Sequence, residues 1–224
     1  MAEQGKRLLA KEIDKPLRVL NLYAGIGGNR KLWQNVDVTA VEYDGKIATI
    51  YQDFFPNDKV IVGDAHEYLL KHYKEFDFIW SSPPCPSHSD IRRCGVHAGQ
   101  NEAIYPEMEL YQEIILLKHF AKGLWVVENV KPYYKPLIDP NVELHRHYFW
   151  SNFYIRPINF NDDRKHNDIN GSSTVYGINI KNYDVEDKRK CLRNMVNPEV
   201  ANYILNCGRD YEPPMQEGLF AEVS

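Results

Sequence analysis

The sequence predicts an α/β protein in which a mostly parallel sheet carries helices on both of its faces. Short runs rich in β-branched and aromatic residues alternate with segments of helical periodicity over residues 17–130. A chain of 224 residues, with 43% hydrophobic and 26% charged residues, is large enough to bury one full core. This alternation is typical of doubly wound sheets, whose ligands bind outside the carboxyl ends of the strands.

Five apolar runs are predicted to be buried parallel strands, because they are continuous rather than alternating. They are LRVLNLY (17–23), VTAVEYD (38–44), KVIVGD (59–64), FDFIWS (76–81) and LWVVENV (124–130). Helices are expected between them in GGNRKLW, GKIATIYQDFF, HEYLLKHY and YPEMELYQEIILLKHF. Polar residues at the strand ends should therefore meet at one edge of the sheet.

Composition restricts the cellular setting and the partners. No apolar stretch approaches the roughly 20 residues that a membrane helix needs, and the N-terminus is too polar for a secretory signal. Four cysteines without a CxxC pair indicate reduced thiols, so we expect a cytoplasmic protein of a bacterial or phage-infected cell, without a membrane partner. The net charge of −4 means that a nucleic acid would have to bind at a local basic face.

A glycine-rich turn follows the first strand directly. Ala24-Gly25-Ile26-Gly27-Gly28 matches neither GxGxxG nor a P-loop, which makes a dinucleotide or a triphosphate the weaker hypothesis. The second strand ends in Glu42-Tyr43-Asp44, where an acid can accept hydrogen bonds from a ribose. The third ends in Gly63-Asp64-Ala65, which supplies a second acid. Together these features predict a nucleoside ligand with little or no phosphate, although Gly and Asp also dominate ordinary turns.

A thiol follows the fourth strand in an unusual setting. In SSPPCPSHS, Pro83 and Pro84 favour an extended backbone that presents Cys85 at the edge of the sheet. The fifth strand ends in Glu128-Asn129, so a thiol and a carboxyl group should meet there and support covalent catalysis. Glu128, when partly desolvated, can hold a proton near neutral pH and pass it to a substrate.

These residues resemble the ordered motifs of the DNA (cytosine-5) methyltransferases. VLNLYAGIGG, VEYD, GDA, SSPPC, ENV and a late RNMVNPEVANYIL follow the family's order and span residues 17–205, nearly the whole chain. The PPC and ENV pair is the specific part, since adenine-N6 and cytosine-N4 enzymes show an Asp- or Ser-Pro-Pro-aromatic tetrapeptide instead. The resemblance implies a Rossmann-like class I S-adenosylmethionine-dependent methyltransferase sheet with a small recognition element.

The resemblance also implies a reaction and a set of site residues. Cys85 would attack carbon 6 of a flipped cytosine in duplex DNA while Glu128 serves ring nitrogen 3, which makes carbon 5 nucleophilic toward the methyl group of S-adenosylmethionine. Tyr23 would lie against the adenine, Glu42 on the ribose and Asp64 near the adenine amino group. The implied cofactor site comprises Tyr23, Ala24, Gly25, Ile26, Gly27, Gly28, Glu42, Tyr43, Asp64, Ala65, Pro83 and Asn194. The implied catalytic set is Cys85, Glu128, Asn129, Arg146 and His147.

The segment after Cys85 is the expected contact with DNA. Base flipping costs a few kcal/mol, which contacts to the displaced strand must offset. Gly95 and Gly99 are expected hinges of a loop that closes over the duplex. The alternative is a solvated surface loop with incidental arginines. The residues suited to DNA binding are Ser87, Ser89, Arg92 and Arg93.

The chain departs from the family pattern in two places. In VELHRHYF, His145 and His147 stand where the family has arginines, so either Arg146 substitutes after a register shift or His147 contacts the cytosine oxygen. Histidines that merely cover a strand edge are the alternative. The stretch between Phe149 and Arg193 is also short. We therefore expect a catalytic domain over 1–156, a target-recognition region over 157–192 and a C-terminal segment over 193–224 that returns to the catalytic domain.

Three other interpretations compete with this one. A zinc site is one, because the chain has two Cys-x2-His pairs of suitable ligand type. The spacing between the two pairs is tight, however, and a zinc site would leave the glycine turn unexplained, so no metal is expected. An RNA (tRNA) cytosine-5 methyltransferase and a catalytically weak DNA-binding relative would carry the same motifs. The zinc-like ligands are Cys85, His88, Cys94 and His97.

Overall fold

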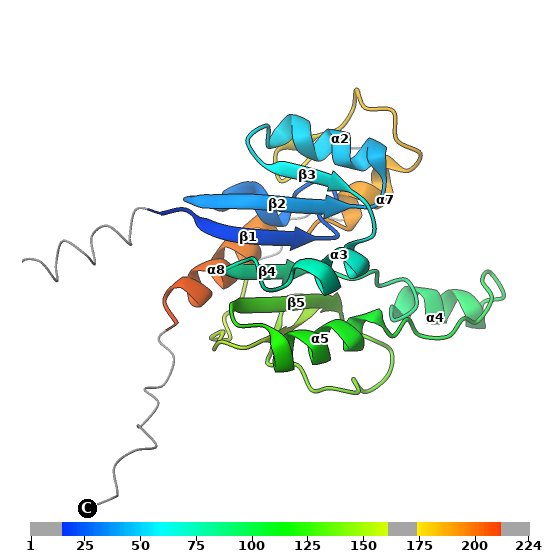
Figure 1. Ribbon diagram of the computed structural model, residues 1–224. Helices are drawn as coiled ribbons and strands as arrows, with labels where there is room; N and C mark the ends of the chain where they lie inside the picture. Colours follow the sequence, from blue (N-terminus) through cyan, green and yellow to red (C-terminus); the bar gives the residue numbers. More distant parts are fainter. Residues whose placement is uncertain (1–14, 161–173, 212–224) are drawn as a thin grey trace, which may run out of the picture.

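The computed structural model describes residues 15–160 and 174–211, and a seven-stranded sheet forms their centre (Figure 1). The strands are β1 (Leu17–Leu22), β2 (Val36–Glu42), β3 (Lys59–Val62), β4 (Phe78–Ser81), β5 (Leu124–Val130), β6 (Val142–Leu144) and β7 (His147–Ser151). Their order is β3-β2-β1-β4-β5-β7-β6. The first five run parallel, β7 runs antiparallel to β5, and β6 antiparallel to β7. The predicted α/β sheet is confirmed, and its parallel strands fall on the five apolar runs.

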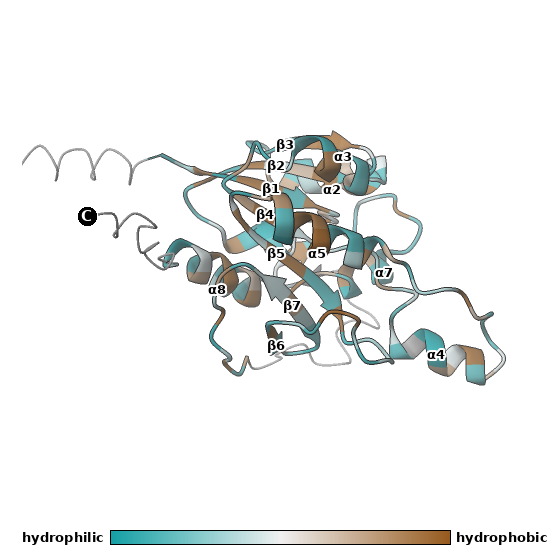
Figure 2. Cartoon of the chain, turned by 60° about the horizontal axis from the view of Figure 1, so that its bottom comes forward, coloured by the Kyte–Doolittle hydropathy of each residue, from teal (hydrophilic) through white to brown (hydrophobic). Residues whose placement is uncertain are grey.

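The central parallel strands β1, β4 and β5 are largely buried on both faces, as their continuous apolar sequence requires. β3, at the edge of the sheet, is half-buried or exposed along its length, so its prediction as a buried strand was wrong. The covering elements are α2 (Gly45–Phe54), α3 (Ala65–His72), α5 (Glu109–Phe120), α8 (Pro198–Arg209) and the 3-10 turn η1 (Asn29–Leu32). α3 and α5 pack on one face around Leu20 and Leu22, whereas α8 packs on the other around Val19 and Trp80. In Figure 2 the hydrophobic colouring gathers on the central strands and on the sides of the helices that meet them. No helix within the described ranges is long and apolar enough to span a membrane.

The acids at the ends of β2 and β3 begin the helices that follow. The Asp44 carboxylate accepts hydrogen bonds from the backbone N–H groups of Lys46 (2.8 Å) and Ile47 (3.3 Å) at the start of α2. Asp64 accepts in the same way from the backbone of Glu67 (2.9 Å) at the start of α3. These bonds satisfy N–H groups that a helix leaves unpaired at its first turn, so the two acids fix where each helix leaves the sheet.

A helix stands where a loop was expected. α4 (Asp90–His97) begins after Ser89, whose hydroxyl accepts from the backbone N–H of Arg92 (3.4 Å). It stands away from the sheet in both views (Figures 1 and 2). Gly95 lies inside the helix, so its prediction as a hinge was wrong, whereas Gly99 follows the helix with a positive φ of +70°. The apolar pattern missed α4 because it is short and mostly polar.

The described part of the predicted recognition region packs on the same body as the glycine turn. A short hairpin, β8 (Thr174–Val175) with β9 (Ile178–Asn179), leads to α7 (Lys188–Arg193). Ile178, Ile180 and Leu192 join Ile26 and Ile50 in one apolar cluster. Residues 161–173 of that region lie outside the described part of the chain. This hairpin and α7 therefore contribute to the core beside α2.

Candidate active site

The chain turns sharply after β1, over residues 23–28. Tyr23 (φ +55°), Gly25 (φ +56°) and Gly27 (φ +83°) adopt left-handed backbone, which glycine reaches without a steric cost. A Cβ added at Gly25 would meet no atom within 4 Å, so this side of the turn is open. A Cβ at Gly27 would clash with the ring of Phe55, so the opposite side packs against the end of α2. The turn is thus rigidly backed and open on one side.

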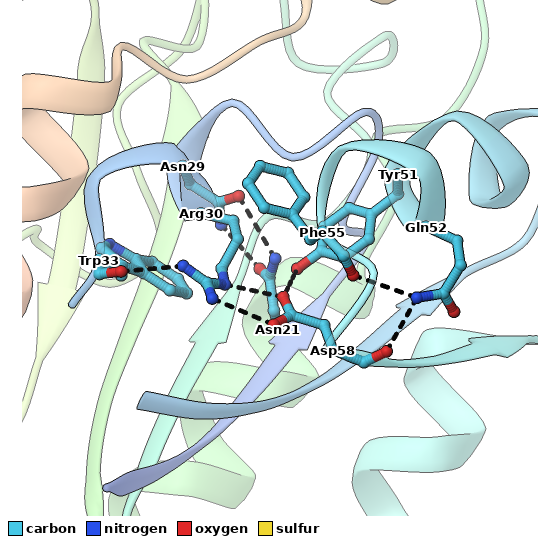
Figure 3. A network of polar contacts seen from close by, with 8 residues as sticks. All are labelled: Asn21, Asn29, Arg30, Trp33, Tyr51, Gln52, Phe55 and Asp58. Carbon is cyan, nitrogen blue, oxygen red and sulfur yellow. Dashed lines mark hydrogen bonds and ion pairs between the residues drawn. The ribbon is translucent and has the colours of Figure 1, made fainter. Parts of the chain in front are cut away.

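A buried polar network lies beside the turn and ties β1 to η1 and α2 (Figure 3). The side chains of Asn21 and Asn29 exchange two hydrogen bonds, of 2.7 and 3.3 Å. The Arg30 guanidinium donates to both carboxylate oxygens of Asp58, at 2.7 and 3.0 Å, and the Tyr51 hydroxyl donates to the same carboxylate at 2.9 Å. Since Asn29 and Arg30 come directly after the glycines, this network fixes the exit of the turn.

The end of β2 braces the open side of the turn. Oε2 of Glu42 accepts from the backbone N–H of Gly25 at 2.8 Å, and Oε1 accepts from the backbone N–H of Asp44 at 3.0 Å. The neighbouring Tyr43 ring is 78% exposed. The open backbone at Gly25, the carboxylate of Glu42 and this ring form a surface that fits the nucleoside part of S-adenosylmethionine. Of the residues that sequence analysis assigned to the cofactor, Gly25 and Glu42 are thus in direct contact.

The remaining predicted cofactor residues surround this surface in different ways. Ala24, Ile26 and Ala65 are buried, and Asp64 is exposed at the start of α3. A Cβ added at Gly28 would lie 2.8 Å from the backbone oxygen of Val196 and 3.0 Å from Cβ of Met195, so these two residues pack behind the turn. Asn194, at the end of α7, is exposed one residue before that contact.

The carboxyl ends of β4 and β5 are locked together beside the thiol. Ser81 and Val127 pair across the two parallel strands. Just beyond them, the side-chain amide of Asn129 donates to the backbone oxygen of Pro83 at 2.9 Å. The Pro-Pro turn then carries half-buried Cys85 out over this edge. The structure thus brings together the strand ends that bear the predicted thiol and carboxyl group, and it gives Asn129 the role of holding them.

The electrostatics of this edge differ from those of a solvent-exposed pair. Glu128 is only 6% exposed, and burial raises its pKa to about 7, against a hydrogen bond from Ser82 that lowers it. Burial also raises the pKa of the Cys85 thiol, and the negative charge of Glu128 raises it further. The cations Arg193 and Lys190 of α7 act in the opposite direction on the thiol. The charge of Glu128 therefore raises the pKa of the thiol, and the two cations of α7 oppose this increase.

His147 lies next to Glu128. In the register of β5 with β7, Glu128 is opposite Phe149, so His147 is its diagonal neighbour on the same face of the sheet. The His147 Nε2 lies 3.4 Å from Oε1 of Glu128. Arg146 precedes it in the turn between β6 and β7 and is exposed. A histidine therefore occupies a position beside the buried acid at the catalytic edge.

Two serines predicted to contact DNA have internal roles. Ser87 is 7% exposed, and its hydroxyl accepts from the backbone N–H of Glu107 at 2.8 Å, which closes the segment 87–107 on itself. The contact of Ser87 with DNA stays a prediction; in this structure its hydroxyl oxygen is buried and already bonded. Ser89 caps α4.

The two arginines of α4 also have partners within the protein. Arg92 donates to the backbone oxygen of Glu102 at 3.0 Å and thereby joins the helix to the returning segment. Arg93 forms an ion pair of 2.8 Å with Asp90, one turn earlier, yet 46% of its side chain is exposed. Of the four predicted DNA contacts, Arg93 is the one that offers an exposed charge.

The zinc alternative required four side chains to converge. His88 is buried, and its Nδ1 lies 2.5 Å from the hydroxyl of Tyr134. Cys94 and His97 are exposed on α4. Over residues 15–160 and 174–211, no group of His, Cys, Asp and Glu is arranged to hold a metal ion. His88 instead anchors the start of the segment that follows Cys85.

Sequence analysis missed a buried acid, Glu113 of α5. It lies on the apolar face of the helix between Leu110 and Leu117 and is fully buried. An acid among apolar residues at helical spacing was the available signal, because a buried carboxylate must find partners. Its partners come from the glycine turn and from the end of β4.

Comparison with known proteins identifies a family for this chain. Residues 17–136, more than half of the chain, match the family described as C-5 cytosine-specific DNA methylase. No curated protein matches the sequence. Two similar solved structures are a hypothetical protein from Thermus thermophilus (17% identity, 66% of this chain and 82% of that chain, TM-score 0.42) and an S-adenosylmethionine-dependent methyltransferase from Agrobacterium tumefaciens (16% identity, 55% and 41%, TM-score 0.38).

Those TM-scores are too low to carry an argument, so the assignment depends on the family match and on the site. The matched residues include the glycine turn, the Pro-Pro-Cys turn and the Glu128-Asn129 strand end. This chain belongs to the family of C-5 cytosine-specific DNA methylases, which transfer a methyl group from S-adenosylmethionine to carbon 5 of cytosine.

Proposed function

We propose that Cys85 adds covalently to carbon 6 of a cytosine flipped out of duplex DNA, and that Glu128 serves ring nitrogen 3 of the same base. The observation that carries this proposal is the shared edge of β4 and β5. Asn129 bonds the carbonyl of Pro83 at 2.9 Å, so the strand that bears Glu128 holds the turn that bears Cys85. The charge of Glu128 is also felt at the thiol.

The protonation of Glu128 suits this role. A carboxyl group whose pKa burial has raised to about 7 still carries a proton on a substantial fraction of molecules at neutral pH. General acids work best when their pKa lies near the operating pH. His147, 3.4 Å away, can donate to the carboxylate or to the substrate once the proton has moved. Glu128 and His147 together therefore supply the proton for ring nitrogen 3.

The bonds and electrons balance in a simple sequence. The Cys85 thiolate forms a C–S bond at carbon 6, the electron pair of the 5,6 double bond moves to carbon 5, and ring nitrogen 3 takes the proton from Glu128. Carbon 5 then forms its bond to the methyl group; S-adenosylmethionine, when bound, would supply this methyl group as an electrophile and would leave as S-adenosylhomocysteine. Transfer of the carbon 5 proton to a water molecule restores the double bond and expels Cys85 as a thiolate, and ring nitrogen 3 returns its proton to the Glu128 carboxylate.

In duplex DNA, base flipping would give the Cys85 thiol access to the target cytosine. Carbon 6 of a stacked cytosine lies inside the duplex, so a thiol at the edge of a sheet reaches it only after the base has left the stack. The segment 87–107, with α4 standing away from the sheet, is the element that can contact the displaced strand (Figure 1). The exposed part of Arg93 offers it a phosphate contact.

Covalent trapping tests this proposal. In the presence of S-adenosylmethionine, a duplex that contains 5-fluorocytosine should be methylated at carbon 5 and then have no proton to lose there, so the adduct with Cys85 should persist in denaturing gels and be mapped to that residue by mass spectrometry. Cys85→Ser should give no adduct. Cys94→Ser, which removes an exposed thiol of α4, is the matched control and should trap as well as the native protein.

Two further measurements separate the competing interpretations. Bisulfite sequencing of DNA from cells that express the chain should reveal 5-methylcytosine in a defined sequence context. Transfer assays on tRNA should give no product; methylation of tRNA alone would favour the RNA alternative. A native protein that binds DNA but neither traps nor methylates would favour a catalytically weak relative and overturn the covalent mechanism.

A further inference from the structure

Glu113 is a buried acid that the reaction described above does not use. Its side chain is fully buried in α5. Oε1 accepts a hydrogen bond from the Tyr23 hydroxyl at 2.6 Å and lies 3.0 Å from Nδ1 of His66. Oε2 accepts from the Ser81 hydroxyl at 2.5 Å. Three side chains from three different elements therefore converge on one carboxyl group.

The two hydroxyl partners belong to opposite halves of the active site. Tyr23 enters the glycine turn with a φ of +55°, in a backbone region that non-glycine residues adopt only under tertiary constraint. Ser81 is the last residue of β4, four positions before Cys85. β1 and β4 are neighbouring strands, with Leu22 opposite Ser81. Glu113 thus bridges the turn that faces the cofactor and the strand that carries the nucleophile.

The third partner brings charge to the cluster. His66 stands in the first turn of α3, with an exposed fraction of 29% for its side chain. Its hydrogen bond to Glu113 raises its pKa, and the charges of Glu113, Glu109 and Asp64 add to the effect. These acids come from both elements that flank the imidazole, α5 and α3. His66 is therefore the cation that faces this acidic group of side chains.

We propose that Glu113 is a positioning residue of the cofactor site, which fixes the Tyr23 ring against bound adenosine and ties it to the catalytic strand through Ser81, with His66 as its counter-ion. This inference rests on the assignment of the glycine turn as the S-adenosylmethionine site. Glu113, Ser81 and His66 would act on that site indirectly, through the position of Tyr23, and would not touch the substrate.

Geometry explains why such a support is needed. The ring of Tyr23 follows a backbone in the left-handed region, and its hydroxyl points into the protein, where it must be paired. A charged acceptor forms a stronger hydrogen bond than a neutral one and holds the ring in one orientation. A ring held in place before binding spares the entropy of ordering it when the ligand arrives. The affinity for the nucleoside should therefore depend on Glu113.

Binding of S-adenosylhomocysteine, measured by isothermal titration calorimetry without DNA, tests this inference directly. Tyr23→Phe removes only the hydroxyl, and Glu113→Gln removes the charge but keeps the size. Each should weaken binding about tenfold, the effect of losing one charge-assisted hydrogen bond. Glu67→Gln is the matched control: it removes an acid from α3 whose partner is the exposed Lys71, and it should leave the affinity unchanged.

The pH dependence distinguishes positioning from simple structural support. The pKa of His66 is raised in the folded protein, so its charge is present below that pKa and is lost as the pH rises through it. The affinity of the native protein for S-adenosylhomocysteine should therefore fall over this range. His66→Gln should bind with an affinity that no longer changes over the same range, although its thermal stability need not differ.

The possible outcomes are separable. Unchanged affinity in Tyr23→Phe would overturn the inference even if Glu113→Gln failed to fold, because Glu113 is proposed to act through that hydroxyl. A pH profile of His66→Gln that matches the native profile would overturn the role of the counter-ion. A native protein that binds S-adenosylhomocysteine but gives no covalent adduct with 5-fluorocytosine would overturn the proposed function and leave this inference standing.

Discussion

The imidazole Nε2 of His147 lies 3.4 Å from the carboxyl Oε1 of Glu128. The pairing of β5 with β7 sets this distance, because it places both side chains on one face of the sheet. Glu128 has a pKa raised by burial to about 7, so this carboxyl group still carries a proton in many molecules at neutral pH. A histidine beside this buried acid thus stands where the family resemblance implies an arginine.

Methyl transfer should show a broad plateau in its pH profile. The reaction requires Glu128 with its proton and Cys85 without one, and burial, followed by the charge of Glu128, raises the pKa of the thiol above its ordinary value. The kcat/KM should therefore rise with pH up to about 7, level off, and fall above the pKa of Cys85. Steady-state rates on a short duplex across the pH range measure it. A profile that already falls well below pH 7 would contradict this assignment.

Glu128→Gln should stabilise the protein at alkaline pH while it abolishes methyl transfer. The pKa of this carboxyl rises from 4.5 to about 7 on folding, so the stability that its proton provides is present below 4.5 and is lost as the pH rises through 7. The shift corresponds to about 3 kcal/mol in the free energy of unfolding. Urea unfolding of both proteins should show their difference growing with pH. Glu67→Gln, at an exposed acid, is the control. If the difference in the free energy of unfolding between the native protein and Glu128→Gln does not change with pH, the prediction is refuted.

His147→Ala should lower the single-turnover rate by about 10²-fold, the usual effect of removing one preorganised donor at the reacting atoms. His147→Arg restores a donor and a charge beside Glu128, and it should recover part of the rate. His119→Ala, an exposed histidine of α5, controls for the loss of an imidazole elsewhere. Equal rates for His147→Ala and the native protein would show that His147 only covers the edge of the strand.

Removing the cations of α7 should make Cys85 less reactive. Lys190 and Arg193 lower the pKa of the thiol, so Lys190→Gln with Arg193→Gln should shift its alkylation by iodoacetamide to higher pH. In a Cys94→Ser background we expect a rate about twofold to fivefold lower at neutral pH. Lys118→Gln with Lys122→Gln removes the same charge at the opposite edge of the sheet, before β5, and should leave the rate unchanged.

The network beside the glycine turn predicts a contrast between two arginine–aspartate pairs. Arg30 and Asp58 keep 15% and 4% of their side chains exposed, whereas Arg18 and Asp77 keep 46% and 40%. Asp58→Asn should cost about 3–5 kcal/mol in the free energy of unfolding, because it leaves a buried guanidinium without its charge partner. Asp77→Asn should cost about 1 kcal/mol or less. Urea unfolding compares them, and equal losses would contradict the buried role.

Sequence periodicity predicted the central parallel strands well because their burial on two faces demands continuous apolar runs. The strand over residues 147–151 is different. His147 and Tyr148 stand at its start and hide the apolar residues Phe149 and Trp150 that follow. The first predicted helix shortened to the 3-10 turn η1, since the chain must turn there to form the network around Arg30. The local sequence pattern therefore failed to predict the two elements in which polar side chains, His147 and Arg30, make contacts at the site.

The site was predictable where strand ends alone determine position. Cys85 follows β4 and Glu128 lies near the carboxyl end of the adjacent parallel strand β5, so their approach follows from topology. The internal partners of Ser87 and Arg92 could not be predicted, because Glu107 and Glu102 lie in a segment that returns to them in space. The role of Glu113 likewise depends on partners from three separate elements, which no local pattern of residues reveals.

The backing of the glycine turn by Met195 and Val196, together with the packing of α8 against η1, has a consequence for biosynthesis. A ribosome delivers the thiol and its carboxyl neighbour long before it delivers residues 195–209, which complete the floor beneath the cofactor. The nascent chain should therefore contain Cys85 and Glu128 before it can bind S-adenosylmethionine. The ability to bind S-adenosylmethionine should therefore arrive only with α8, so premature termination before residue 195 should yield an inert product rather than a weak enzyme.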